Sequence, residues 1–145
     1  MTDNVALIND LYAAFQRGDI DAVFSHMAPD IDWRSVGDSA DWPGFGHRHG
    51  VEEVRGYFAA QADELDFTGF EVKDIDAAGA NPDGDAKVLA EGVSSFTFKQ
   101  GGLPADAEWV HIFTLRDGKI VRFREYMDTA TVSRARARSC GMAAA

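Results

Sequence analysis

His111 and Asp128 are the two residues whose type and placement could support acid/base chemistry. His111 lies two residues after Trp109 in one extended run, so the two share a face, and Asp128 lies two residues after Tyr126 in the next. Asp117-Gly118 between the runs predicts a tight hairpin. The hairpin would make the two strands neighbours, so both side chains could face one pocket. An imidazole beside a carboxylate in an apolar cavity can move protons near neutral pH. The pair is therefore the candidate acid/base site.

The same two residues also have a structural interpretation. His111 would then be a hydrogen-bonded core histidine, and Asp128 would cap a segment that begins Thr129-Ala130-Thr131. Neither residue lies in a spacing that identifies a reaction, so the sequence leaves both interpretations open.

Motifs for several other kinds of chemistry are absent from the sequence. It carries no GxGxxG, Walker, GxSxG or HExxH pattern, which argues against nucleotide binding, phosphoryl transfer, a serine-hydrolase triad and zincin chemistry. His47 and His49 form an HxH pair, but no third ligand follows at a fixed spacing. We therefore expect neither a metal nor a cofactor.

The composition is that of one globular domain rich in aromatic residues. Ten Phe and three Trp among 145 residues indicate a large apolar core or a lined pocket. The formal charge of -10 opposes binding to nucleic acids or anionic lipids, and no 18 apolar residues run together, so neither partner is expected. The single Cys140 and the absence of a basic, apolar leader predict a cytoplasmic protein.

Three amphipathic helices are predicted in the first half of the chain. Apolar residues repeat at helical spacing over 5–15 and again over 20–27, and Gly18-Asp19 between them ends one helix and caps the next. The third helix spans 51–63. A short strand is predicted over 30–36, and the glycine-rich segment that follows it, up to Gly50, is predicted to be a long loop.

The second half of the chain changes to extended periodicity. The four predicted strands are 67–77, 87–99, 107–115 and 119–126. Helices followed by antiparallel strands predict an α+β fold, with the helices packed on one face of a curved sheet. The concave side of such a sheet is the natural place for a small molecule. The Ala-, Ser- and Arg-rich segment 133–145, with Arg134, Arg136 and Arg138, is predicted to be a flexible tail without a function.

Several short motifs in the same order resemble SnoaL-like, ketosteroid-isomerase-like members of the nuclear transport factor 2-like superfamily. The motifs are Tyr12-Ala-Ala-Phe15-Gln-Arg-Gly18-Asp19, Asp30-Ile-Asp-Trp33, Pro43-Gly-Phe-Gly46, His49-Gly50-Val51-Glu52-Glu53-Val54, Trp109-Val-His111, Asp117-Gly118-Lys119-Ile120 and Arg124-Glu-Tyr126-Met-Asp128-Thr129. The resemblance extends from residue 5 to about 132, which makes 1–132 the expected domain. It implies a cone of strongly curved mixed sheet around three N-terminal helices, commonly a homodimer through the outer sheet face.

The resemblance also allows individual activities to be compared residue by residue. The proton-shuttling Asp of the ketosteroid isomerases falls at Ser35, and their oxyanion Tyr falls at Leu11, one place before Tyr12. The Arg-x-Asp pair of the epoxide hydrolases is replaced by Trp109 and His111. Both of these activities are therefore predicted to be absent. The SnoaL-like cyclases, with an Asp at the place of Asp128 and a nearby His, match best.

Three functions follow from the residues and the resemblance together. The first is a cofactor-independent lyase or isomerase, cyclase-like, with Asp128 as base and His111 as acid or oxyanion donor. Its apolar pocket for a carbonyl-containing small molecule would be lined by Tyr12, Trp33, Trp42, Phe58, Trp109, Phe113 and Tyr126. The second is a noncatalytic small-molecule binding protein of the same fold. The third is a dimeric scaffold whose pocket is a packing remnant.

Overall fold

The computed structural model describes residues 3–141. Helix α1 (Asn4–Gln16) begins at Asp3, whose carboxylate accepts a hydrogen bond from Ala6 N at 3.0 Å. It ends before Gly18, which has a φ of 77°. Asp19 then caps α2 (Ile20–Ser25) by accepting from Ala22 N at 3.1 Å. The stop and start predicted at Gly18-Asp19 are thus confirmed.

Strand β1 (Met27–Ser35) follows directly, and α3 (Val51–Glu64) begins after the glycine-rich segment. The end of that segment, predicted to be a loop, forms the short strand β2 (Gly46–His49), which pairs antiparallel with β1. Its earlier part carries Trp42 and Phe45, both only 2% exposed. Their burial fixes the segment against the core.

Four long strands complete the sheet: β3 (Leu65–Ala80), β4 (Ala86–Phe98), β5 (Pro104–Arg116) and β6 (Lys119–Met127). Consecutive strands pair antiparallel, as predicted. The β5–β6 turn has φ values of 52° at Asp117 and 75° at Gly118, and Arg116 pairs with Lys119. Positive φ at both central positions is typical of a type I′ turn, so the predicted hairpin is confirmed.

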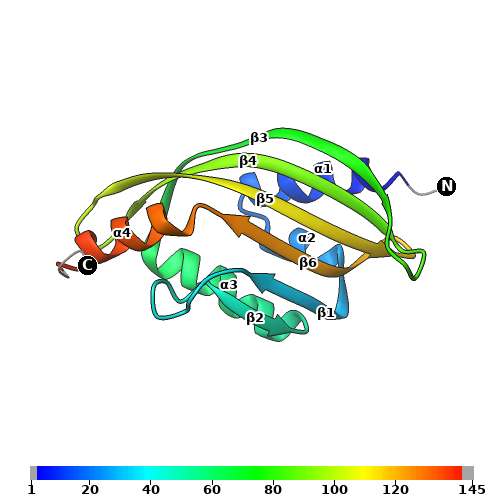
Figure 1. The fold of residues 1–145 in the computed structure, drawn as a ribbon, viewed down its shortest axis with the longest axis horizontal. Helices are drawn as coiled ribbons and strands as arrows, with labels where there is room; N and C mark the ends of the chain where they lie inside the picture. Colours follow the sequence, from blue (N-terminus) through cyan, green and yellow to red (C-terminus); the bar gives the residue numbers. More distant parts are fainter. Residues whose placement is uncertain (1–2, 142–145) are drawn as a thin grey trace.

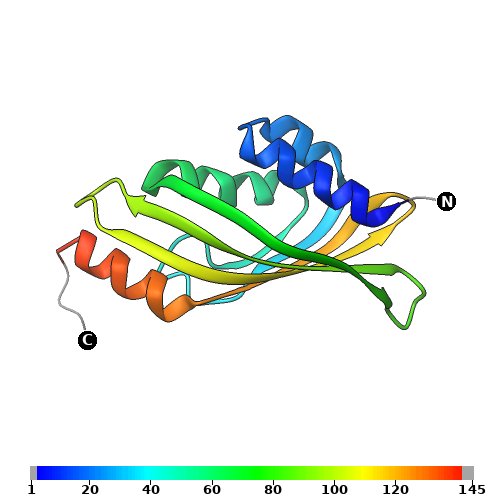
Figure 2. The same ribbon diagram turned by 90° about the horizontal axis from the view of Figure 1, so that it is seen from above.

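The six strands form one mixed sheet in the order β2-β1-β6-β5-β4-β3. Only β1 and β6 run parallel, which brings the first long strand beside the last. Figure 1 shows the sheet curving along its length, and Figure 2 shows α1, α2 and α3 together on its concave side. The predicted α+β architecture is confirmed, and the core lies between these helices and the sheet.

The segment after β6 differs from the flexible tail predicted for 133–145. Helix α4 (Thr129–Ser139) packs at one end of the sheet, where Val132 is 2% exposed. Arg136 Nη2 pairs with Glu64 Oε1 of α3 at 2.9 Å. A tertiary ion pair and the packing of Val132 and Ala135 on the core therefore stabilise this helix, which the composition of the segment did not predict. The rest of the predicted tail, 142–145, lies outside the described residues.

No helix within residues 3–141 has both the length and the apolar character needed to cross a membrane.

Candidate functional site

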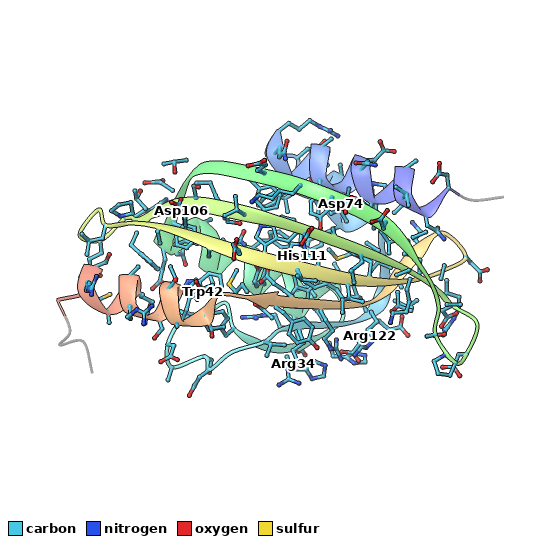
Figure 3. All side chains as sticks on the ribbon, turned by 45° about the horizontal axis from the view of Figure 1, so that its top comes forward. Arg34, Trp42, Asp74, Asp106, His111 and Arg122 are labelled. Atoms are coloured by element: carbon cyan, nitrogen blue, oxygen red, sulfur yellow. The ribbon has the colours of Figure 1, made fainter. Side chains whose placement is uncertain are left out.

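His111 lies in β5 (Figure 3), and its contact with Tyr12 of α1 places it on the face of the sheet that the helices cover. The pleat places Trp109 and Phe113 on the same face, as predicted, and all three are almost fully buried. The imidazole stacks on the Trp109 indole with ring centroids 4.0 Å apart. His111 is therefore a rigidly held, desolvated side chain.

The strand partner of His111 is Glu125 of β6. Glu125 Oε2 lies 2.7 Å from His111 Nε2, and both side chains are less than 10% exposed. The carboxylate that faces the imidazole is thus Glu125, a residue that the sequence analysis did not select.

A β-bulge explains why Glu125 occupies this position. Leu115 pairs with Ile120, but Thr114 pairs with Arg122, so Val121 is an extra residue in β6. Without it, His111 would oppose Arg124, and Asp128 would share the inner face with Arg124. One inserted residue moves every following side chain to the other face. The regular alternation assumed from the sequence therefore selected the wrong side of β6.

Asp128 and Tyr126 consequently lie outside the pocket. Tyr126 is 47% exposed on the outer face. Asp128 is exposed beyond the end of β6 and caps α4, accepting hydrogen bonds from Thr131 N at 3.2 Å and from Thr131 Oγ1. These two bonds lower the pKa of the Asp128 carboxyl. The expectation that Asp128 and His111 face one pocket was wrong, and the structural interpretation of Asp128 as a cap is the one observed.

Two hydroxyl groups complete the environment of the Glu125 carboxylate. Ser35 Oγ at the end of β1 donates to Glu125 Oε1 at 2.7 Å, and Tyr57 Oη of α3 donates to the same oxygen at 2.9 Å. The Gln61 amide, one helical turn after Tyr57, donates to Tyr57 Oη at 2.9 Å. Side chains from β1, α3 and β5 therefore converge on the buried Glu125 carboxylate of β6.

The far side of the imidazole contacts α1. Tyr12 Oη lies 2.7 Å from His111 Nδ1, and the two rings are nearly parallel, at 16°, with centroids 5.9 Å apart. Tyr12, His111 and Glu125 thus form a continuous hydrogen-bonded chain that runs from helix to sheet.

The electrostatics of this chain favour an ionised Glu125 and neutral tyrosines. Burial raises the pKa of Glu125, but the hydrogen bonds from His111, Ser35 and Tyr57 outweigh it and hold that pKa below its usual value. Burial, and then the Glu125 charge, raises the pKa of Tyr12 and of Tyr57 well above the usual value. Both phenols therefore keep their protons at neutral pH.

An apolar cavity of about 50 Å³ lies beside the hydrogen-bonded chain and is called the inner cavity below. Tyr12, His111 and Glu125 line it, together with apolar side chains of the core. The predicted residues that line it are Tyr12, Trp33, Phe58 and Phe113. The volume suffices for a few water molecules or a small functional group.

Two further predicted pocket residues lie next to the inner cavity. Trp42 lines a second space of about 30 Å³, which also touches Tyr57 and Glu125. Trp109 is buried behind His111, where its indole also stacks on Phe70 at 5.2 Å. Trp42 and Trp109 therefore support the walls of the site.

Nothing in the site resembles a metal centre. Among residues 3–141, no three His, Cys, Asp or Glu side chains gather closely enough to hold a metal ion. His47, from the HxH pair, instead contacts Asp32 Oδ1 at 2.6 Å on the outer face.

Comparisons with known proteins agree with the fold. The SnoaL-like domain family matches residues 8–123. A nuclear transport factor 2-like protein from Burkholderia thailandensis is 30% identical, with a TM-score of 0.74 over 94% of this chain and 98% of that one. A protein of the same type and of unknown function from Burkholderia pseudomallei is 23% identical, with a TM-score of 0.81 over 93% and 98%.

A structure from Pseudomonas putida, described as that of a polyketide cyclase, is 17% identical to this chain. Its TM-score is 0.72, over 93% of this chain and 98% of the other. A comparison with functionally curated proteins gives no match.

Proposed function

Since this chain belongs to the SnoaL-like domain family of the nuclear transport factor 2-like superfamily, we propose that it is a cofactor-independent acid/base enzyme of cyclase or isomerase type. Its substrate would be a small, mostly apolar compound that carries a carbonyl group. The observation that supports this proposal is the hydrogen-bonded series Tyr12–His111–Glu125 beside an apolar cavity.

Glu125 acts in this proposal as the counter-ion of His111. Its two oxygens are already engaged by His111, Ser35 and Tyr57, so the carboxylate is a poor proton acceptor for a substrate. A buried carboxylate hydrogen-bonded to an imidazole fixes the ring orientation and stabilises the imidazolium form. The sequence analysis expected Asp128 as the carboxylate beside His111, and gave it the role of the base.

Tyr12 and His111 together would exchange one proton with the substrate. In the resting state His111 Nε2–H donates to Glu125 and Tyr12 O–H donates to His111 Nδ1, which leaves the lone pairs of Tyr12 Oη free. When a substrate carbon next to a carbonyl gives its proton to Tyr12 Oη, the phenolic proton passes to His111 Nδ1. The products are an enolate and an imidazolium–Glu125 ion pair. Reversal of these steps onto another carbon completes an isomerisation.

Trp33 offers a hydrogen bond for the substrate oxygen. It lines the inner cavity, and its buried Nε1 donates to no acceptor among residues 3–141. A buried donor without a partner is costly, and a carbonyl or enolate oxygen would satisfy it. The apolar surroundings strengthen any such bond.

Proton exchange at carbon tests the proposal directly. Simple ketones, beginning with acetone, are incubated with the protein in D2O, and loss of the α-proton signal is followed by NMR. Tyr12→Phe should slow protein-dependent exchange by roughly 10²-fold or more, the usual contribution of a general acid/base group. Tyr126→Phe, which removes the hydroxyl group of an exposed tyrosine, is the matched control. Exchange that is equal in Tyr12→Phe and wild type, or absent for every ketone, would overturn the proposal.

A noncatalytic binding protein is the second candidate. The complete hydrogen bonding of Glu125 favours it, because a binding site needs no group with spare proton-accepting capacity. Ligand-induced stabilisation that is the same in wild type and Tyr12→Phe, with no α-exchange, would support binding without turnover.

The outer face of the sheet is the proposed homodimer interface. Leu89 is 39% and Tyr126 47% exposed there, and Val110 and Ile112 beside them are half-buried. These side chains would be covered by the same surface of a second copy, as in an isologous interface. Light scattering should give a dimer for the wild type and a monomer for Ile112→Glu; a monomeric wild type would contradict the proposal.

A further inference from the structure

A larger recess lies beside the inner cavity. It has a volume of about 540 Å³ and is bounded by the C-terminal parts of α1 and α3 and the first residues of β3. We call it the mouth groove. Its apolar walls include Phe15, Ile20, Phe58, Leu65, Phe67 and Phe70.

The mouth groove and the inner cavity share one wall. Phe15, Phe58, Gln61 and Phe70 line both spaces. The Phe15 ring centroid lies 5.0 Å from that of Phe70 and 6.2 Å from that of Phe58. These three phenylalanines are only partly buried. A single layer of side chains therefore separates the groove from the space beside Tyr12 and His111.

The two volumes indicate different roles for the two spaces. Pockets that enclose a drug-sized molecule are about 300–1,000 Å³, a range that includes the groove and excludes the inner cavity. The inner cavity can accept a carbonyl and its neighbouring carbon. Any larger part of the same molecule must extend past Phe15 and Phe58 into the groove.

Gln61 is the polar side chain in the shared wall, and its orientation follows from its neighbours. Tyr57 Oη donates its proton to the Glu125 carboxylate, so the phenolic oxygen can only accept from Gln61, which must present its NH₂ group. The side-chain oxygen Oε1 of Gln61 then faces away from Tyr57, and among residues 3–141 it accepts no hydrogen bond. It is an available acceptor between the two spaces.

We propose that the mouth groove is a second ligand subsite, which binds a flat apolar ring system attached to the carbonyl group, and that Gln61 accepts a hydrogen bond from a hydroxyl on that ring. The preferred ligands are thus hydroxylated aromatic ketones. The role of the carbonyl rests on the proposed function, whereas binding in the groove does not.

Three ketones of graded size test the subsite: acetone, 2-acetylnaphthalene and 6-hydroxy-2-acetylnaphthalene. Dissociation constants come from calorimetry, and α-proton exchange is followed by NMR on the same samples. Ala62→Trp fills the groove from an exposed position of α3, and Ala59→Trp adds the same ring on α3 outside the groove lining. Circular dichroism establishes that both variants are folded.

In the expected result, Ala62→Trp weakens binding of 2-acetylnaphthalene about tenfold or more, whereas Ala59→Trp binds like the wild type. Acetone exchange is the same in all three proteins. Equal naphthyl ketone affinity in Ala62→Trp and Ala59→Trp would overturn the subsite. If the affinities change as expected but no ketone exchanges its α-proton, the enzymatic proposal fails and the subsite stands.

The role of Gln61 is tested by comparing the two naphthyl ketones. Wild type should bind the hydroxylated compound roughly 2- to 10-fold more tightly, as one net hydrogen bond allows. Gln61→Met should reduce this ratio to about 1 while it continues to bind 2-acetylnaphthalene. A ratio in Gln61→Met equal to that of the wild type would refute the assignment.

Discussion

Replacing Glu125 with Gln tests whether the buried carboxylate organises the site. The amide has the same shape but no charge: its oxygen can still accept from Ser35 and Tyr57, whereas its NH₂ group cannot accept the hydrogen bond from His111 Nε2. Bonds to charged groups contribute about 1 kcal/mol more than neutral ones, so we expect a loss of about 2–4 kcal/mol in the free energy of unfolding. For a chain of this length that corresponds to roughly 5–15 °C in Tm.

The pH dependence of this loss distinguishes charge from shape. Because the pKa of Glu125 is lowered in the folded protein, its ionisation stabilises the fold above the unfolded value of about 4.3. That contribution is lost as the pH falls through the lower, folded pKa. The difference between wild type and Glu125→Gln should therefore be constant from pH 7 to about 5 and shrink below about 4.

Urea unfolding followed by circular dichroism between pH 7 and 3.5 provides the measurement. Glu108→Gln makes the same atomic change at an exposed side chain of β5 and should alter stability by no more than about 0.5 kcal/mol. Equal stability of Glu125→Gln and wild type at pH 7, or a difference that does not shrink in acid, would refute the electrostatic assignment.

Three further outcomes follow from the geometry. Gly92→Ala should destabilise the fold by about 1–3 kcal/mol in urea unfolding, because the new Cβ would lie 2.1 Å from the Glu71 carbonyl oxygen. The control Gly69→Ala, whose new Cβ would lie 3.5 Å from Ser95 Cβ, should leave stability nearly unchanged. Asp128→Ala should lower stability by about 1 kcal/mol through loss of the α4 cap, with α-proton exchange unchanged; slowed exchange would restore Asp128 as a catalytic candidate. Since the pKa of Tyr57 is raised in the folded protein, wild type should lose stability as the pH rises above about 10. Tyr57→Phe should lose less stability over the same alkaline titration, and equal losses would contradict a raised pKa for Tyr57.

Much of the fold could be predicted from local patterns in the sequence. The stop at Gly18, the cap at Asp19 and the turn at Asp117-Gly118 depend on backbone preferences of single residues, which act within a few positions of the chain. Alternation along β5 correctly placed His111 on the inner face, because that strand contains no irregularity between Trp109 and Phe113.

Only the tertiary structure decided which carboxylate His111 meets. The extra residue Val121 in β6 changes the strand register, and no glycine or proline marks the bulge. Ser35 and Tyr57 reach Glu125 from 90 and 68 residues away, through the parallel pairing of β1 with β6 and the packing of α3. Local preferences thus determined the elements and the turns of this protein, whereas the buried acid/base chain arises from register and long-range packing, which no local pattern encodes.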